Sequence, residues 1–185
     1  MSGNNLIRAE ATERARLLTV DGYVVDWDLT TGETEFDSTT QVTFGCSEPG
    51  ASTFIELIAA SVTSIELNGT AMDPATAVAG NRITLDGLRA ENVLRVVARC
   101  IYSRSGEGLH RFVDPVDKEV YVYSQFETAD AKRAYACFDQ PDLKGTFSFA
   151  VTTQSHWQVV SNEPIARATS QSKKQRLLAR SNLPD

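Results

Sequence analysis

Residues 36–46 read FDSTTQVTFGC, and the alternation of their side chains decides the fold class. Every second residue of a β-strand lies on the same face. One face would therefore carry Phe36, Ser38, Thr40, Val42, Phe44 and Cys46. The stretch is also rich in Thr and Val, which favour strands. It predicts a long β-strand with one largely apolar face.

The same period of two continues on both sides of this stretch. Tyr23, Val25, Trp27 and Leu29 alternate with Val24, Asp26 and Asp28, which predicts a half-buried strand. Further strands are expected at residues 53–58, 62–67, 82–85, 92–102, 118–126, 146–153, 157–161 and 176–179. About ten short strands separated by turn residues are typical of an all-β protein. The prediction is an antiparallel β-sandwich or saddle-shaped domain, with a helical turn over residues 128–136.

One expected strand carries a finer prediction. Residues 92–102 have apolar side chains on both faces, and Val93 and Ile101 share one of them. Strands that are apolar on both faces are typical of the middle of a covered sheet. We therefore expect parts of both faces of this strand to be buried.

The first residues predict a short helix. Residues 5–17 can form a helix capped by Asn5. Its charged residues suit a helix in solvent: Glu10, Glu13, Arg14 and Arg16. The chain then divides into an N-terminal helical segment, residues 1–18, and a β-saddle domain, residues 19–185. The polar end from Ala179 to Asp185 follows a strand and indicates a cut through a longer protein.

Composition excludes several classes of protein. The 185 residues are 42% hydrophobic, which is enough for a sizeable core. The net charge is −6 and the 18 Lys and Arg residues are scattered, so no nucleic-acid partner is expected. Three widely spaced cysteines without a C-x-x-C pair indicate buried thiols in a reducing compartment. No signal peptide and no long apolar run is present, so we expect a cytoplasmic protein without a membrane partner.

The most informative polar residues stand at the end of one expected strand. Gln125 and Glu127 are two residues apart, so strand geometry points a carboxamide and a carboxylate into the same space. An Ala- and Arg-rich segment follows, and then Cys-Phe-Asp-Gln-Pro-Asp-Leu-Lys-Gly-Thr-Phe over residues 137–147. Spacing alone also fits two polar residues that merely face solvent, because short motifs are frequent by chance.

The order of these residues resembles the zinc aminopeptidases related to aminopeptidase N and leukotriene hydrolase. The chain matches the family pattern at Gln125, Phe126, Glu127, Arg133, Cys137, Phe138, Asp139, Pro141, Asp142, Lys144, Thr146 and Phe147. Segments 108–110 and 157–162 also agree with the family's N-terminal domain. Two positions depart from the pattern: Gln140 stands where many relatives have Glu, and Gly145 where they often have Ala.

The resemblance implies a substrate site shared with a catalytic domain beyond residue 185. Glu127 would anchor the free α-amine of a peptide, and Gln125 would line the pocket for its first side chain. The partners would be the catalytic domain of the same parent chain and the N-terminus of a peptide substrate. The family's H-E-x-x-H motif is absent and the only histidines are His110 and His156. Zinc would therefore bind to the absent catalytic domain, and this chain alone would bind no metal and hydrolyse no peptide.

Two other functions remain open at this point. A stand-alone β-sandwich module that binds glycans or proteins predicts an exposed aromatic platform. A purely structural spacer predicts that Gln125 and Glu127 are buried in an ordinary hydrogen-bond network. Docking to a catalytic domain predicts an exposed apolar patch near residues 123–140.

Overall fold

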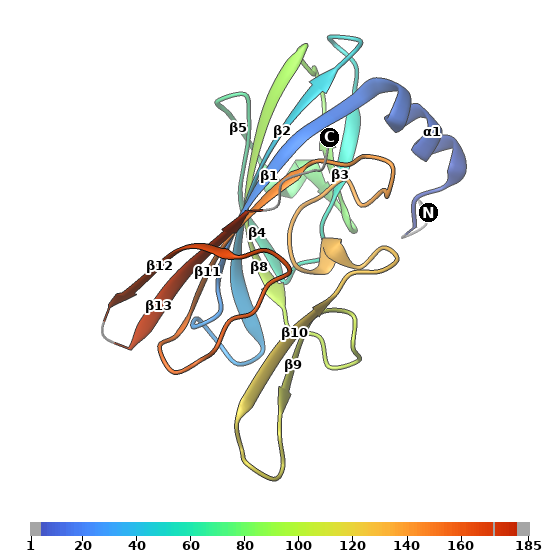
Figure 1. The fold of residues 1–185 in the computed structure, drawn as a ribbon. Helices are drawn as coiled ribbons and strands as arrows, with labels where there is room; N and C mark the ends of the chain where they lie inside the picture. Colours follow the sequence, from blue (N-terminus) through green and yellow to red (C-terminus); the bar gives the residue numbers. More distant parts are fainter. Residues whose placement is uncertain (1–4, 172, 181–185) are drawn as a thin grey trace.

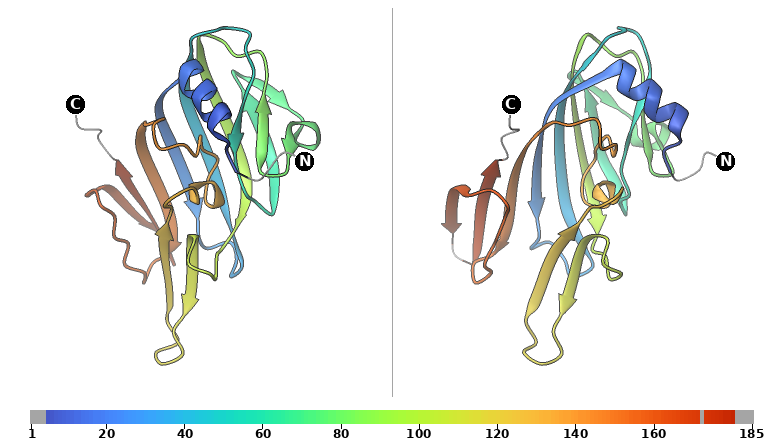
Figure 2. Two further views of the ribbon diagram at one scale, coloured as in Figure 1. Left: turned by 90° about the vertical axis from the view of Figure 1, so that its right-hand side faces the viewer. Right: turned by 45° about the vertical axis from the view of Figure 1, so that its right-hand side comes forward.

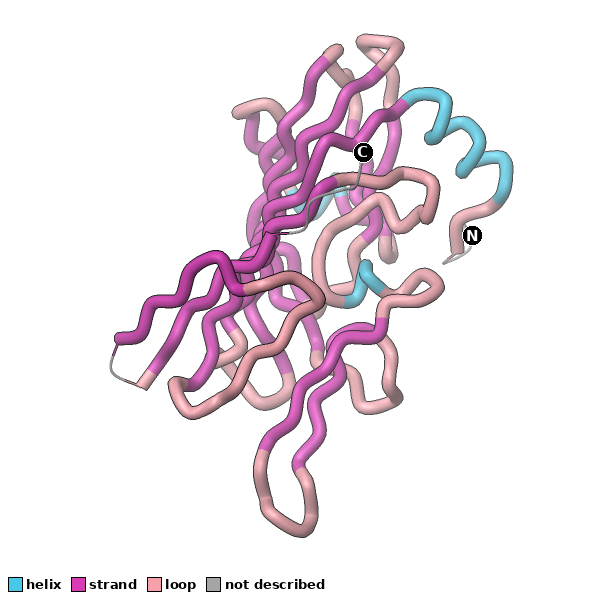
Figure 3. Tube along the Cα trace, viewed as in Figure 1, coloured by secondary structure: helices cyan, strands magenta, loops and turns pink. Residues whose placement is uncertain are grey.

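Strands dominate the structure, a computed structural model that describes residues 5–171 and 173–180, and the predicted all-β class is confirmed (Figure 3). The strands are β1 (Leu18–Asp28), β2 (Glu35–Cys46), β3 (Thr53–Glu56), β4 (Ser61–Leu67), β5 (Thr70–Met72), β6 (Val78–Ala79), β7 (Arg82–Leu85), β8 (Glu91–Ile101), β9 (Gly108–Val113), β10 (Val120–Gln125), β11 (Thr146–Gln154), β12 (Ile165–Gln171) and β13 (Lys174–Arg180). The helices are α1 (Arg8–Leu17), α2 (Pro74–Ala77) and the single 3₁₀ turn η1 (Ala131–Arg133).

The strands form one large sheet and two small ones. The large sheet has the order β12-β13-β11-β1-β2-β8-β4-β5, a second has β3-β7-β6, and β9 pairs with β10 in a hairpin (Figure 1). Among the pairs of strands in the described residues, only β1 with β11 is parallel, where an entirely antiparallel arrangement was predicted. Parallel neighbours need a long crossover. Most of the chain, including a segment that crosses the core, lies between these two strands.

The core lies between the large sheet and the β3-β7-β6 sheet. The predicted apolar face of β2 is buried along its whole length, from Phe36 to Cys46. Tyr23, Val25 and Trp27 of β1 are buried beside it, as predicted. The two-residue period therefore identified both the strands and the faces that they bury.

The outer face of the large sheet differs from the prediction. Leu94, Val96 and Cys100 of β8 are buried, but Val93 and Ile101 on the opposite face are exposed. Figure 2 shows the small sheet and the connecting segments on the inner side of the large sheet. The expectation that both faces of this strand are buried is therefore wrong at Val93 and Ile101.

The strand predictions are least accurate near the C-terminus and at β9. Residues 157–161 form no strand, and Val160 is largely exposed. The edge that such a strand would need on β13 is taken by β12, which the sequence pattern did not indicate. Residues 108–113 form β9, which was not predicted either. Residues 181–185, the end of the segment interpreted as a cut, lie outside the described residues.

Helix α1 is present, but its start and its buried face differ from the prediction. The N-cap position is Ile7 rather than Asn5, and Glu10 accepts a hydrogen bond from the Ile7 backbone N–H at 3.1 Å. Arg14, predicted to face solvent, is 2% exposed. The helix continues directly into β1 at Leu18. No helix among the described residues is long and apolar enough to cross a membrane.

Candidate functional site

Gln125 and Glu127 lie at the open end of strand β10. Gln125 is its last residue, Glu127 begins the following turn, and both are exposed. The peptide bond from Glu127 to Thr128 is cis. Within the described part of the chain, neither side chain has a hydrogen bond or ion pair. The burial that the spacer alternative predicts is therefore not found.

The turn that carries Glu127 is held at both ends. Phe126 is half-buried and meets the ring of Tyr135 edge-on at 5.7 Å between centroids. The Asp130 N–H donates to the Phe126 carbonyl at 3.0 Å. The predicted helical turn is present as η1, where Arg133 Nε donates to Asp130 Oδ1 at 2.6 Å. These contacts fix the backbone of the turn. The Glu127 side chain projects from it without a hydrogen bond or ion pair among the described residues.

Beyond η1 the chain enters the core as a fully buried segment, Ala134–Phe138, which we call the strut. Trp27 Nε1 and Ser38 Oγ both donate to the carbonyl of its first residue, at 3.0 and 2.9 Å. The Ala136 N–H donates to Thr40 Oγ1 at 3.2 Å. Buried backbone groups need such partners. The polar residues on the apolar face of β2 therefore satisfy the backbone of the strut.

The strut makes hydrogen bonds on both of its sides. The Phe138 N–H donates to the Tyr23 hydroxyl at 3.1 Å, and burial raises the pKa of Tyr23, which keeps that hydroxyl protonated. On the other side, Cys137 and Glu56 exchange two backbone hydrogen bonds of 3.0 Å. Burial also raises the pKa of the Cys137 thiol, so it is a core residue and not a ready nucleophile.

A buried ionic cluster ties helix α1 to the end of the strut. Arg14 Nη1 lies 2.7 Å from Glu56 Oε2, and Arg14 Nε donates to Gln140 Oε1 at 3.0 Å. Gln140 Nε2 donates in turn to the Ala11 carbonyl at 2.9 Å. Gln140 is buried and joins helix α1 to the end of the strut.

Asp139 links the end of the strut to η1. Its carboxylate accepts from the Lys132 N–H at 3.4 Å and lies 3.9 Å from Lys132 Nζ. Burial raises the pKa of Asp139 above its ordinary value. Its contacts brace η1 against the strut.

The hairpin that ends in Gln125 packs on η1 through a glycine. Gly108 pairs with Gln125 in the β9–β10 register and has a φ of +66°. A Cβ atom built on Gly108 would lie 2.7 Å from the Cβ of Arg133. Only glycine allows this close approach, so Gly108 lets the hairpin pack against Arg133 of η1.

Gly108→Ala is expected to destabilise the chain by about 2–4 kcal/mol, because it adds a steric overlap to an unfavourable backbone angle. Gly87→Ala is the matched control, since Gly87 has a φ of +63° and no atom within 4 Å of an added Cβ. The control should lose only about 1–2 kcal/mol. Urea unfolding of both variants measures the difference. Equal losses would show that the approach to Arg133 is not a constraint.

The two histidines lie in surroundings that suit a structural role. His110 Nδ1 accepts from the Gly106 N–H at 3.1 Å, and its ring lies 4.8 Å from that of Tyr123. His156 lies in a turn. Among the residues that the structure describes, no three His, Cys, Asp or Glu side chains gather closely enough to hold a metal ion. The side chains of the described residues therefore do not form a zinc site by themselves.

Sequence reasoning found the two projecting side chains but not their support. Trp27 was predicted to lie on the apolar face of a half-buried strand, and its burial confirms this, but its hydrogen bond to the strut was not foreseen. The signal available was the pair of hydroxyl residues, Ser38 and Thr40, in an otherwise apolar face. Nothing in the local pattern indicated that Arg14 would be buried.

The chain is similar in sequence to known peptidases. It matches the Peptidase M1 N-terminal domain family over residues 94–180. It is 51% identical over 167 residues to the aminopeptidase N of Streptomyces lividans, an alignment that covers 89% of this chain and 20% of that protein. It is 28% identical over 112 residues to the alanine/arginine aminopeptidase of Saccharomyces cerevisiae, covering 58% of this chain and 13% of the yeast protein.

The fold has also been seen in a solved structure. The M1 zinc metallopeptidase from Deinococcus radiodurans superposes with a TM-score of 0.69 at 19% identity, over 91% of this chain and 40% of that chain. At this identity the likeness concerns the fold alone. The present chain spans about a fifth of the length of the Streptomyces relative.

Proposed function

The chain belongs to the Peptidase M1 N-terminal domain family, and on this premise we propose that it recognises the substrate and caps the active site of a zinc aminopeptidase. The parent enzyme removes single residues from the amino end of peptides. The catalytic domain belongs to the same longer chain, and the fragment alone is inactive. The limited share of the Streptomyces relative that this chain spans supports the proposal.

The observation that carries the proposal is the pair of free polar side chains on a fixed support. Gln125 and Glu127 are exposed, and the chain that follows them is anchored in the core. A carboxylate in a cavity closed from water binds an ammonium group through a charge-assisted hydrogen bond. Such a bond contributes about 1.5–3 kcal/mol. Glu127 is therefore suited to hold the α-amine of a peptide.

Fixing the amine also orients the reaction. With the α-amine held at Glu127, only the first peptide bond lies at the distance where cleavage takes place, which converts binding into positioning. Gln125 offers a carboxamide to the same space and lines the pocket of the first side chain. Zinc binds to residues of the parent outside this chain. The three buried, unpaired cysteines fit a reducing compartment, and we propose the cytoplasm as the location.

The full-length parent is expected to hydrolyse amino-acid anilides with a free α-amine and to fail on their N-acetylated counterparts. The loss of the ammonium contact should lower kcat/KM at least about tenfold. A chelator should abolish the activity and zinc should restore it, while the 185-residue chain alone should show none. Equal rates on free and acetylated anilides would contradict the proposal.

A further inference from the structure

The β9–β10 hairpin stands apart from the body of the domain. It forms its own two-stranded sheet and projects from the core in every view (Figures 1 and 2). Its base is joined to the segment after β8, where the Ser103 N–H donates to the Leu109 carbonyl at 2.9 Å and the Arg111 N–H donates to the Ser103 carbonyl at 3.1 Å. The base of the hairpin is therefore fixed to the domain, whereas its outer half projects from it.

One face of the hairpin is aromatic and exposed. Tyr121 pairs with Phe112, and Tyr123 pairs with His110. Residues opposite each other in an antiparallel pair share a face, as do alternate residues of one strand. Phe112 is 44% exposed and Tyr123 51%. The shared face, which we call the aromatic face, consists of His110, Phe112, Tyr121, Tyr123 and Gln125.

The aromatic face thus runs directly into the proposed substrate site, because Gln125 is its last member. Within residues 123–140, Tyr123 is the one large hydrophobic side chain that is exposed. The apolar patch expected near those residues therefore lies mainly on the hairpin before them. The exposed aromatic face therefore adjoins Gln125, which faces a closed cavity if the proposed function holds.

The opposite face of the hairpin is also partly apolar. Val113 is exposed there, and Val116 in the tip is more exposed still. A two-stranded ribbon is at best marginally stable in water without further packing. The tip is nevertheless well formed, since the Val116 and Glu119 N–H groups donate to Asp114 and Asp117 at 2.7 and 2.8 Å. A permanent partner suits such a ribbon better than a transient ligand.

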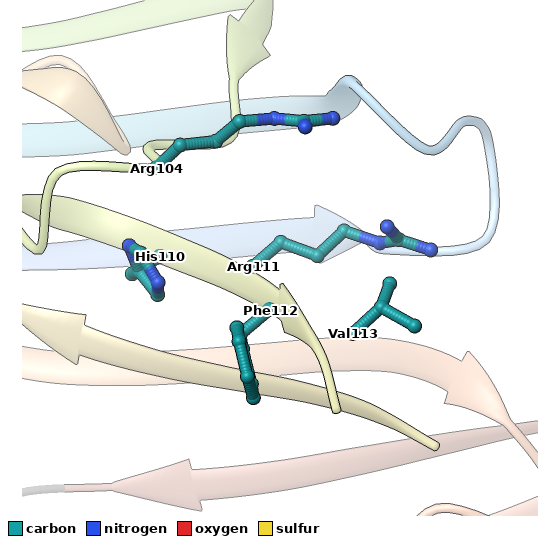
Figure 4. Close-up of a pocket in the computed structure, with 5 residues that line it drawn as sticks. All are labelled: Arg104, His110, Arg111, Phe112 and Val113. Atoms are coloured by element: carbon teal, nitrogen blue, oxygen red, sulfur yellow. The ribbon is translucent and has the colours of Figure 1, made fainter. Parts of the chain in front are cut away.

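The chemistry around the hairpin is that of a protein interface. A hollow of about 240 Å³ lies beside β9, lined by Arg104, His110, Arg111, Phe112 and Val113 (Figure 4). Tyr, Phe and Arg are enriched at the centres of interfaces, and Tyr and Arg often carry the binding energy. The hollow offers a recess for a side chain of the partner, next to the aromatic face.

We propose that the β9–β10 hairpin is the docking element through which this domain is held to the catalytic domain of its own longer chain. This inference rests on the proposed function. The aromatic face and Gln125 are then covered by the same partner, so the hairpin forms a wall of the substrate cavity. A second copy of the chain or a glycan would not need to lie over Gln125.

Cysteine labelling in the full-length parent tests this docking with matched positions. Phe112→Cys is compared with Val93→Cys, since both side chains are 44% exposed in this domain. Tyr123→Cys, at 51%, is compared with Val24→Cys, at 50%. Val24 and Val93 lie on the outer face of the large sheet. The three native cysteines of this domain are buried, so they add little background to labelling by a charged maleimide, and the parent without an added cysteine gives the remaining background.

The hairpin cysteines are expected to react at least about tenfold more slowly than their controls in the native parent, and at equal rates in urea. The second pair keeps the test valid if Phe112→Cys does not fold. Equal native rates would overturn the proposal. So would protection that appears only at high protein concentration, which indicates a second copy, or only with added oligosaccharide, which indicates a glycan platform.

The same samples separate this inference from the proposed function. Each variant is assayed on anilides with free and acetylated amines. Fast labelling of the hairpin together with amine-dependent hydrolysis would overturn the docking element and leave the proposed function intact. A protected hairpin without such hydrolysis would support the docking and contradict the aminopeptidase.

Discussion

Glu127→Ala in the full-length parent is expected to lower kcat/KM on amino-acid anilides by about 10- to 100-fold, because it removes a charge-assisted hydrogen bond worth about 1.5–3 kcal/mol. The folded domain should be unaffected, since the Glu127 side chain is exposed. Loss of orientation would appear in kcat as well as in KM. Steady-state kinetics on a series of anilides measures both.

The controls separate charge from position. Glu127→Gln keeps the size and loses the charge, whereas Glu127→Asp keeps the charge and withdraws it, so both should fall between Glu127→Ala and the unchanged enzyme. Glu66→Ala removes an exposed carboxylate from β4 and should have no effect. A change within about twofold for Glu127→Ala would show that this residue is not the amine anchor.

Arg14→Ala is expected to destabilise the chain by about 3–5 kcal/mol, because it leaves the Glu56 carboxylate buried without its partner. The two side chains are 2% and 4% exposed and lie 2.7 Å apart. Arg14 also stacks over the rings of Phe54 and Phe138, at 4.9 and 5.6 Å from their centroids. Urea unfolding gives the free energy of unfolding for each variant.

The same helix supplies the comparison for Arg14. Arg16 makes exposed ion pairs with Glu13 and Glu48, so Arg16→Ala should leave the free energy of unfolding nearly unchanged. The double variant Arg14→Met with Glu56→Leu removes both charges and should recover much of the loss. Similar costs for Arg14→Ala and Arg16→Ala would mean that the buried pair contributes little.

The fold could be predicted as far as local periodicity reaches. The alternation in β1 and β2 identified two central strands and their buried face, because one face of each packs on the core. The same reasoning failed at Val93 and Ile101, since an apolar residue does not reveal whether a second layer covers it. Strands β9 and β12 are defined by their partners rather than by their own patterns.

The site could be predicted only in part for a related reason. Gln125 and Glu127 stand two residues apart in the sequence, so they were found together, although β10 ends at Gln125 and Glu127 lies in the following turn. Their supports come from residues about a hundred positions away, such as Ser38, which bonds to the carbonyl of Ala134. Arg14 was assigned to solvent because its neighbours along the helix are charged. Its burial is set by Glu56 and Gln140, which reach it only in the folded chain.

The parallel pairing of β1 with β11 has a consequence for synthesis on the ribosome. Residues 22–28 of β1 pair with residues 146–152, so one strand is made early and its neighbour late. Until β11 emerges, the nascent chain carries a free, hydrogen-bonding strand edge beside the β1–β2 hairpin. Such edges recruit strands from other molecules. A nascent or truncated chain that stops before β11 keeps that edge open and is prone to aggregate, whatever the quality of the core already made.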